Sequence, residues 1–165
     1  METEIIIAYR DKIKSAGASE QESLFREMTE AVLRHRRVAN SGIMQMMKME
    51  LAYCSYREQS ITIRFPVEHW QLNPLNTMHG GLSATACDST GGLLTRVAAF
   101  TGITPTVSLN MNYLAPIQEG THLMIKATVE HLGRTLAQIS MDGWIEETGK
   151  PAVMATGVYM PKAPA

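Results

Sequence analysis

The spacing of apolar residues changes from helical to strand-like along the first 66 residues. Apolar side chains recur every three or four positions over Leu24–Val32, which predicts a helix over about residues 19–36. Ser19 and Glu22 have the spacing of a capping box in its first turn. We expect a shorter helix before it, and two strands after it that form a hairpin ending at Pro66.

The pattern changes twice more in the second half. Residues 68–77 contain a proline and two asparagines, which predicts a loop. The next segment, 80–100, is small or apolar on nearly every side and carries only Asp88 and Arg96 as charges, which indicates a helix inside the fold. After it polar and apolar residues alternate. Four strands in a meander are predicted there, at 106–113, 121–132, 134–147 and 151–160. The order indicates an α+β protein whose antiparallel sheet wraps the central helix.

Composition excludes several function classes. The chain has 165 residues, enough for one domain, and 15 basic against 16 acidic side chains give no argument for a nucleic-acid or membrane partner. No segment approaches the roughly 18 uncharged apolar residues of a membrane span. Two cysteines and the absence of a secretory signal favour a reduced cytoplasmic location. The five histidines show no metal-ligand spacing, so we expect no metal.

Asp88 raises the main question about chemistry. Its helical neighbours three and four positions away offer no basic partner; they are Ala84, Thr85, Gly91 and Gly92. Burying an unpaired carboxylate costs several kcal/mol unless it is hydrogen-bonded. Either Asp88 bonds a hydroxyl such as that of Thr85 or Ser89, or it faces solvent, or the small neighbours admit a ligand or another backbone that uses it.

The two glycines at the helix start suggest an anion site. Gly80 and Gly81 follow a loop, where free N–H groups and the positive end of the helix dipole can bind an oxyanion, although a plain helix entry would use glycines too. His79 and Asp88 lie nine residues apart, about 180° around the helix and roughly 13–14 Å along it. If both serve one site, that site combines two copies of the chain.

These residues together resemble a known family. Asn73, His79-Gly80-Gly81, Asp88 and the strand TVSLNMNYLAP (106–116) resemble the hotdog-fold acyl-CoA thioesterases of the PaaI-like branch. The resemblance covers about residues 45–165, the expected hotdog domain. Residues 1–44 carry no family motif and form an expected N-terminal helical extension.

The resemblance implies a role for each motif residue. Asp88 would be the catalytic carboxylate, as general base on water or as nucleophile. The N–H of Gly81 or Gly80 from the other subunit would polarise the thioester carbonyl. Asn73 and His79 would position the thioester or the loop, and Thr106 would hold the attacking water.

The resemblance also implies partners. The substrate would be an acyl-CoA with an aromatic or medium-chain acyl group, and CoA would be part of the substrate, with no separate cofactor. Two subunits would join their sheets edge to edge as a homodimer, pairing again into a homotetramer. Arg134 is the first candidate for binding CoA phosphates, before Arg64 and Lys126, although each could be an ordinary surface charge. The methionine-rich segment 43–49 would line the pocket or only pack.

Two alternative functions stay open at this point. A hydratase or dehydratase of the same fold would use an acidic helix residue together with a loop histidine in a different motif. A non-catalytic acyl-CoA-binding module would keep the pocket without needing Asp88. Release of thiol from acyl-CoAs separates these alternatives from a thioesterase.

Overall fold

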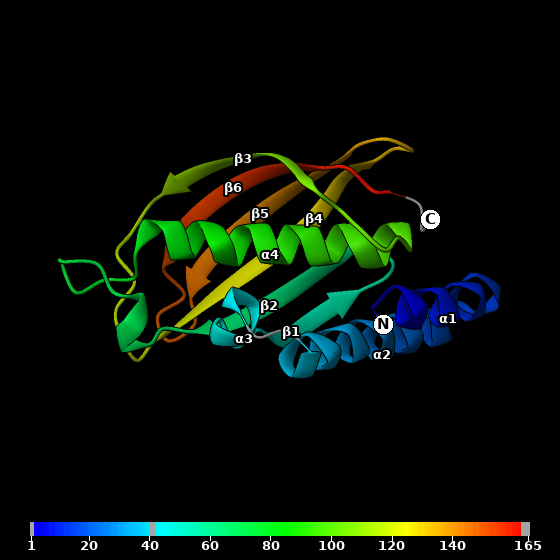
Figure 1. Ribbon diagram of the computed structural model, residues 1–165, viewed down its shortest axis with the longest axis horizontal. Coiled ribbons are helices and arrows are strands. Elements are labelled where there is room, and N and C mark those ends of the chain that lie inside the picture. The colour runs from blue at the N-terminus through cyan, green and yellow to red at the C-terminus, as the bar shows by residue number, and fades with distance from the viewer. Residues whose placement is uncertain (1, 40–41, 163–165) are drawn as a thin grey trace.

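The computed structural model describes residues 2–39 and 42–162, shown as a ribbon in Figure 1. Residues 1, 40, 41 and 163–165 lie outside the described residues, and they include the start of the expected extension (1–44) and the end of the expected hotdog domain (45–165). The helices are α1 (Glu2–Ser15), α2 (Ala18–Ala39), α3 (Ile43–Met46), the 3-10 turn η1 (His69–Gln71) and α4 (Gly80–Ala99). The strands are β1 (Glu50–Ser55), β2 (Ser60–Pro66), β3 (Thr106–Tyr113), β4 (His122–Leu132), β5 (Ala137–Ile145) and β6 (Pro151–Tyr159).

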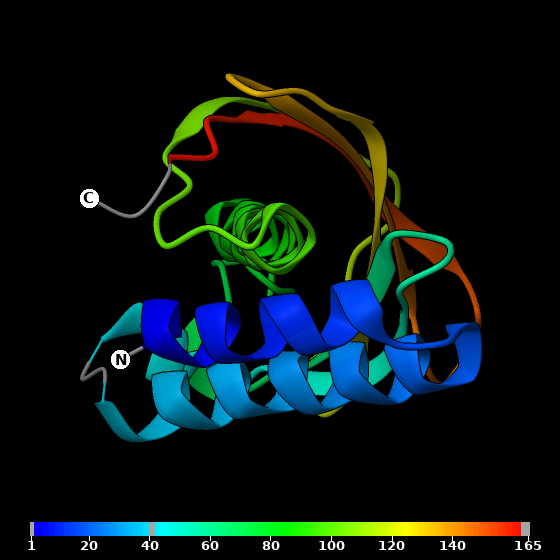
Figure 2. The ribbon, with the colours of Figure 1, turned by 90° about the vertical axis from the view of Figure 1, so that its right-hand side faces the viewer.

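The strands form one antiparallel sheet in the order β1-β2-β4-β5-β6-β3. The predicted hairpin and strands are present, but the predicted four-strand meander is wrong in one respect. Of these four strands, only β4, β5 and β6 are neighbours in chain order, whereas β3 lies beside β6 at the far edge. The chain leaves α4 on that side of the curved sheet, so β3 extends the far edge and β4 pairs with β2 instead (Figure 2).

Helix α4 lies inside the curve of the sheet, as the apolar segment predicts (Figures 1 and 2). Its side chains Leu93, Leu94 and Val97 are fully buried. The strands supply matching apolar positions; β5 alternates buried and more exposed residues along its length. Removal of these side chains from water is the main favourable term in forming such a core. None of the described helices is both long and apolar enough to cross a membrane.

The two N-terminal helices, α1 and α2, pack together below α4 and cover the sheet edge formed by β1. Both predicted N-terminal helices are present, and α2 contacts both β1 and α4 (Figure 2). The edge at β1 is therefore covered by helix. The edge at β3 has no such cover in the described part of the chain, and its residues Val107 and Tyr113 are more than half exposed.

Glu22 does not complete the predicted capping box. Its carboxylate accepts hydrogen bonds from the Tyr56 and Arg57 N–H groups at 2.8 and 2.9 Å and from the Ser55 hydroxyl at 3.1 Å. It thus holds the turn between β1 and β2 onto α2. Both the start of α2 and the β1–β2 turn have N–H groups that need an acceptor. The packing of α2 against β1 places the Glu22 carboxylate at the turn.

We expect Glu22→Ala to destabilise the fold by about 1–3 kcal/mol, because three donors lose a charged acceptor. Burial alone would raise the pKa of Glu22, but the hydrogen bonds from Arg57, Tyr56 and Ser55 outweigh burial and lower it. This stabilisation is therefore present above the unfolded pKa of about 4.3 and is lost as the pH falls through the folded pKa.

Denaturant unfolding of both proteins at pH 7 and at acid pH measures the effect. The matched change Glu20→Ala, at an exposed position in the same helix, should alter stability by less than about 0.5 kcal/mol. Equal losses for the two variants would contradict the role of Glu22.

Candidate functional site

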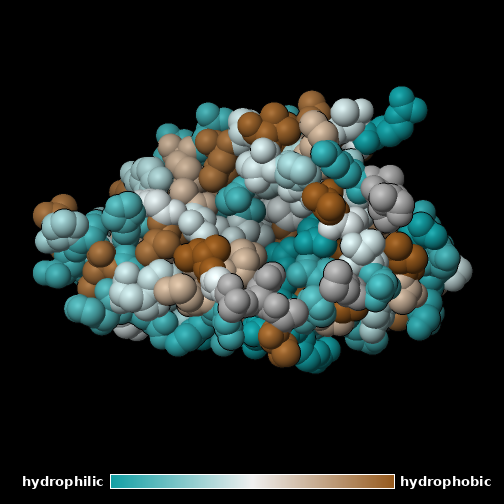
Figure 3. Space-filling view, in the orientation of Figure 1, coloured by the Kyte–Doolittle hydropathy of each residue, from teal (hydrophilic) through white to brown (hydrophobic). Residues whose placement is uncertain are grey.

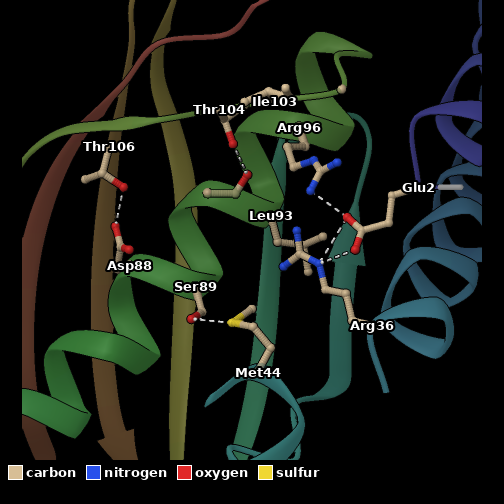
Figure 4. Close-up of a pocket in the computed structure, with 12 residues that line it drawn as sticks. Glu2, Arg36, Met44, Asp88, Ser89, Leu93, Arg96, Ile103, Thr104 and Thr106 are labelled. Carbon is tan, nitrogen blue, oxygen red and sulfur yellow. Dashed lines mark hydrogen bonds and ion pairs between the residues drawn. The ribbon is translucent and has the colours of Figure 1, made fainter. Parts of the chain in front are cut away.

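Asp88 lies in the middle of α4 and faces the start of β3. The Thr106 hydroxyl donates a hydrogen bond of 2.7 Å to Asp88 Oδ1 (Figure 4). This bond explains how a carboxylate without a basic neighbour is held in a largely apolar helix. Neither Thr85 nor Ser89 serves as its partner: Thr85 donates to Gly81 O and Ser89 to the Met44 sulfur.

Asp88 and Thr106 line a cavity of about 420 Å³ that runs along one face of α4. Helices α1, α2 and α3 form part of its wall through Glu2, Arg36 and Met44 (Figure 4). Neither Glu2 nor Arg36 is among the predicted site residues, because neither lies in the family motif. For the methionine-rich segment the structure combines both expectations: Met44 lines the cavity, whereas Met47 and Met49 are buried.

A second cavity, of about 350 Å³, lies at the start of α4. Its lining includes Asn73, Gly80 and Tyr113. The Tyr113 hydroxyl, at the end of β3, donates to Gly80 O at 3.1 Å. The predicted site residues therefore fall into two groups within one chain, Asp88 with Thr106 at one end of β3 and Asn73 with Gly80 at the other.

His79 acts as the N-cap of α4. Its Nδ1 accepts a hydrogen bond of 2.9 Å from the Gly81 N–H. The Leu82 and Ser83 N–H groups donate to the His79 carbonyl. Within the described residues, the Gly80 N–H has no acceptor. Of the two predicted oxyanion donors, the structure thus occupies Gly81 and leaves Gly80 available.

Asn73 shapes the loop before α4. Its Oδ1 accepts from the Leu75 and Thr77 N–H groups, and its Nδ2 donates to the Thr77 hydroxyl. Its side-chain donors and acceptors are therefore engaged in the turn, which fits the loop-positioning alternative. Pro74 and the positive φ of 57° at Asn76 belong to the same turn.

Tyr159 fixes the position of α4 under β6. The tyrosine is fully buried, its ring lies against Gly91 and Gly92, and its hydroxyl is 3.4 Å from the Asp88 carbonyl, to which it donates. Burial, with the nearby Asp88 as a second cause, raises the pKa of Tyr159, which keeps the hydroxyl protonated as a donor. The glycines beside Asp88 thus make room for this ring.

Two other groups were possible sources of chemistry, a cysteine next to Asp88 and a cluster of histidine and glutamates, and neither provides a reactive centre. Burial raises the pKa of the Cys87 thiol to about 12, so this cysteine does not provide a thiolate. His122, Glu146 and Glu147 form the one cluster with metal-ligand spacing among residues 2–39 and 42–162. There His122 Nδ1 lies 2.6 Å from Glu147 Oε1, and Arg64 Nε donates to Glu146 at 2.6 Å. Contacts of His122 and Arg64 with the two carboxylates account for this cluster. Arg64 is therefore already paired with Glu146.

Arg134 lies away from both cavities. It is exposed and lines a surface cavity of about 530 Å³ together with Arg10 and Lys14 of α1. Arg10 also pairs with Asp11 at 3.0 Å, and the Lys14 ammonium lies over the Phe100 ring. Lys126, the other candidate, pairs with Glu58 at 3.7 Å.

Comparison with known proteins agrees with this picture. Residues 75–152 match the model of the Thioesterase superfamily. Mouse acyl-coenzyme A thioesterase 13 is 34% identical over 94 residues, which cover 56% of this chain and 66% of that protein. A hypothetical thioesterase of Streptococcus pneumoniae, crystallised with coenzyme A, is 25% identical with a TM-score of 0.63 and covers 70% of this chain and 90% of its own.

The E. coli PaaI protein of the phenylacetic acid degradation operon shares the fold at 14% identity, with a TM-score of 0.71 over 83% of this chain and 96% of its own. The chain spans about 60–66% of the length of the curated thioesterase 13 relatives. These comparisons confirm the predicted resemblance to hotdog-fold thioesterases.

We expect Gly91→Ala to destabilise the protein by about 1–3 kcal/mol through overpacking. The added methyl would lie 2.3 Å from the Tyr159 hydroxyl oxygen and would push α4 away from β6. Gly92→Ala is the matched control, since its methyl would meet the ring at an ordinary 3.7 Å and would gain helix propensity of up to about 1 kcal/mol. Thermal unfolding compares them, and a Gly91→Ala protein as stable as Gly92→Ala would contradict the packing described.

Proposed function

We propose that this protein hydrolyses an acyl-CoA thioester, with an aromatic or medium-chain acyl group, at a site shared by two copies of the chain. The observation that carries the proposal is the placement of the two residue groups at opposite ends of β3. Asp88 bonds Thr106, the first residue of the strand, and Gly80 contacts Tyr113, the last.

The exposed edge supports pairing of two chains. β3 is an edge strand whose outer backbone groups are unpaired in the described structure, and Val107, Tyr113, Leu114 and Met154 nearby are at least half exposed. Figure 3 shows apolar side chains over this part of the surface, interspersed with hydrophilic ones. An open edge with apolar side chains favours addition of another strand.

Two-fold symmetry then brings the two groups together. If β3 pairs antiparallel with its copy about an axis near Leu109 and Asn110, the Thr106 end of one strand lies opposite the Tyr113 end of the other. Asp88 of one chain would face the Gly80 N–H of its partner. The sequence-based argument that His79 and Asp88 lie on opposite helix faces leads to the same arrangement.

The reaction needs one base and one oxyanion donor, because a thioester is already activated. Asp88 takes a proton from water as the water oxygen attacks the carbonyl carbon, or Asp88 itself attacks and water then cleaves the anhydride. The Gly80 N–H stabilises the oxyanion. The C–S bond breaks, and the CoA sulfur receives the proton that Asp88 took from water in the first route, or a proton from the water that cleaves the anhydride in the second. In this scheme Thr106 orients the carboxylate.

We assign the CoA phosphates to the cavity lined by Arg134, Arg10 and Lys14. Three cations at one surface hollow suit a phosphorylated nucleotide. Two of the three come from α1, which extends the predicted role of Arg134. A homodimer is the smallest active unit in this proposal, whereas the homotetramer and the cytoplasmic location stay predictions.

A thiol-release assay on aromatic and straight-chain acyl-CoAs tests the proposal. Asp88→Asn should lower kcat by about 10²–10⁴-fold, because an amide can neither accept the proton nor attack. Asp142→Asn, an exposed acid on β5, is the matched control and should keep full activity. Equal rates for wild type and Asp88→Asn would refute the role of Asp88. No release from any substrate would favour the binding module or a hydratase.

A further inference from the structure

The cavity at Asp88 ends at a cluster of charges. Asp88, Gly92 and Arg96 all line it and follow one another at four-residue steps on one face of α4. The Arg96 Cα therefore lies roughly 12 Å along the helix from that of Asp88. Leu93 and Met44 make the wall between Asp88 and the charged end partly apolar, and Ile103 lies near Arg96 (Figure 4).

Three helices supply the charged end. Glu2 of α1 accepts a hydrogen bond from Arg36 Nε of α2 at 3.2 Å and forms an ion pair with Arg96 of α4 at 2.5 Å (Figure 4). The side chains of Glu2, Arg36 and Arg96 are only 11, 9 and 17% exposed. His35 lies 3.8 Å from Glu2 on the same side.

The cluster carries more positive charge than its own acid can balance. One carboxylate serves two guanidinium groups, and Asp88 is bound to Thr106 at the other end of the cavity. Arg96 Nε is also buried without a hydrogen-bond partner among residues 2–39 and 42–162. An unpaired buried donor and an excess charge both favour an anionic acceptor. Burial of the Arg96 guanidinium away from water also lowers its pKa, which shows that its positive charge is poorly solvated.

We propose that this cluster binds a carboxylate at the far end of the acyl group, so that the preferred substrates are ω-carboxyacyl-CoA thioesters. The inference rests on the proposed function, since it places the thioester at Asp88. A hydrogen bond at each end takes up about 3 Å of the roughly 12 Å of helix between Asp88 and Arg96. An acyl chain of about six to eight carbon atoms spans such a gap.

The CoA phosphates are the other source of an anion. They would occupy the same arginines if the thioester lay the other way round in the cavity. The two sources differ in one measurable respect: loss of an arginine that binds the acyl carboxylate weakens only ω-carboxy substrates, whereas loss of one that binds phosphate weakens every acyl-CoA.

The experiment compares ω-carboxyacyl-CoAs of four to ten carbons with unsubstituted acyl-CoAs of equal length. We expect kcat/KM of the wild type to favour the ω-carboxy form by about tenfold or more at one length. Arg96→Gln should abolish this preference. Glu2→Gln should increase it, because the competing carboxylate is gone. Arg26→Gln, which removes an exposed pair with Glu30, is the matched control and should leave the preference unchanged.

The opposite signs at Glu2 and Arg96 separate binding from a purely structural role, which would weaken the protein in both variants. Equal kcat/KM for both substrate forms at every length would overturn the proposal, as would an equal loss for both forms in Arg96→Gln. Calorimetric binding of the same thioesters to Asp88→Asn keeps the test independent of hydrolysis. Preferential binding without turnover by the wild type would support the inference and refute the proposed function.

Discussion

The hydrogen bond from Thr106 to Asp88 joins the middle of the buried helix to the open edge of the sheet. It holds a carboxylate in an otherwise apolar helix and sets it beside the strand at which a second chain can add. Tyr159 supports the arrangement from the β6 side, since its ring occupies the space left by Gly91 and Gly92 and its hydroxyl donates to the Asp88 carbonyl. At the other end of β3, Tyr113 holds the start of the same helix.

The N-terminal helices change what this cavity can accept. Without Glu2, Arg36 and Met44, the Asp88 cavity would lose one wall and its charged end. Burying three charged side chains carries a desolvation cost that their pairing only partly offsets, so packing alone gives little reason for this arrangement. The apolar side chains of α1 and α2 account for how the helices pack, with Ile6, Ile13, Phe25 and Met28 fully buried. The charged side chains at the end of the cavity are better explained by binding of the anionic ligand proposed above than by packing.

Periodicity was enough to predict α1, α2, α4 and the six strands, because each buries one face or, for α4, nearly all faces; the short α3 and η1 were not predicted. It could not predict that β3 joins the far edge, since strand order depends on where the chain leaves α4. It also could not predict Glu22 on the β1–β2 turn, because the same spacing fits a capping box. The motif made Asp88, Gly80 and Thr106 candidates, and the structure places Asp88 and Thr106 at one cavity. Glu2 and Arg36 were missed because a cavity wall formed by distant helices leaves no local pattern.

The sharing of one site by two chains is tested most directly by mixing two inactive variants. Gly80→Pro removes the oxyanion N–H at the first helical position, where proline fits, after a His79 whose extended backbone suits a following proline. Gly80→Ala is the matched control, because it adds a Cβ atom 3.3 Å from the Tyr113 ring, as proline does, but keeps the N–H; it should stay active. Asp88→Asn and Gly80→Pro, unfolded together and refolded as a mixture, should recover about a quarter of wild-type activity, because mixed dimers rebuild one of two sites. A mixture no more active than the separate variants would contradict a shared site.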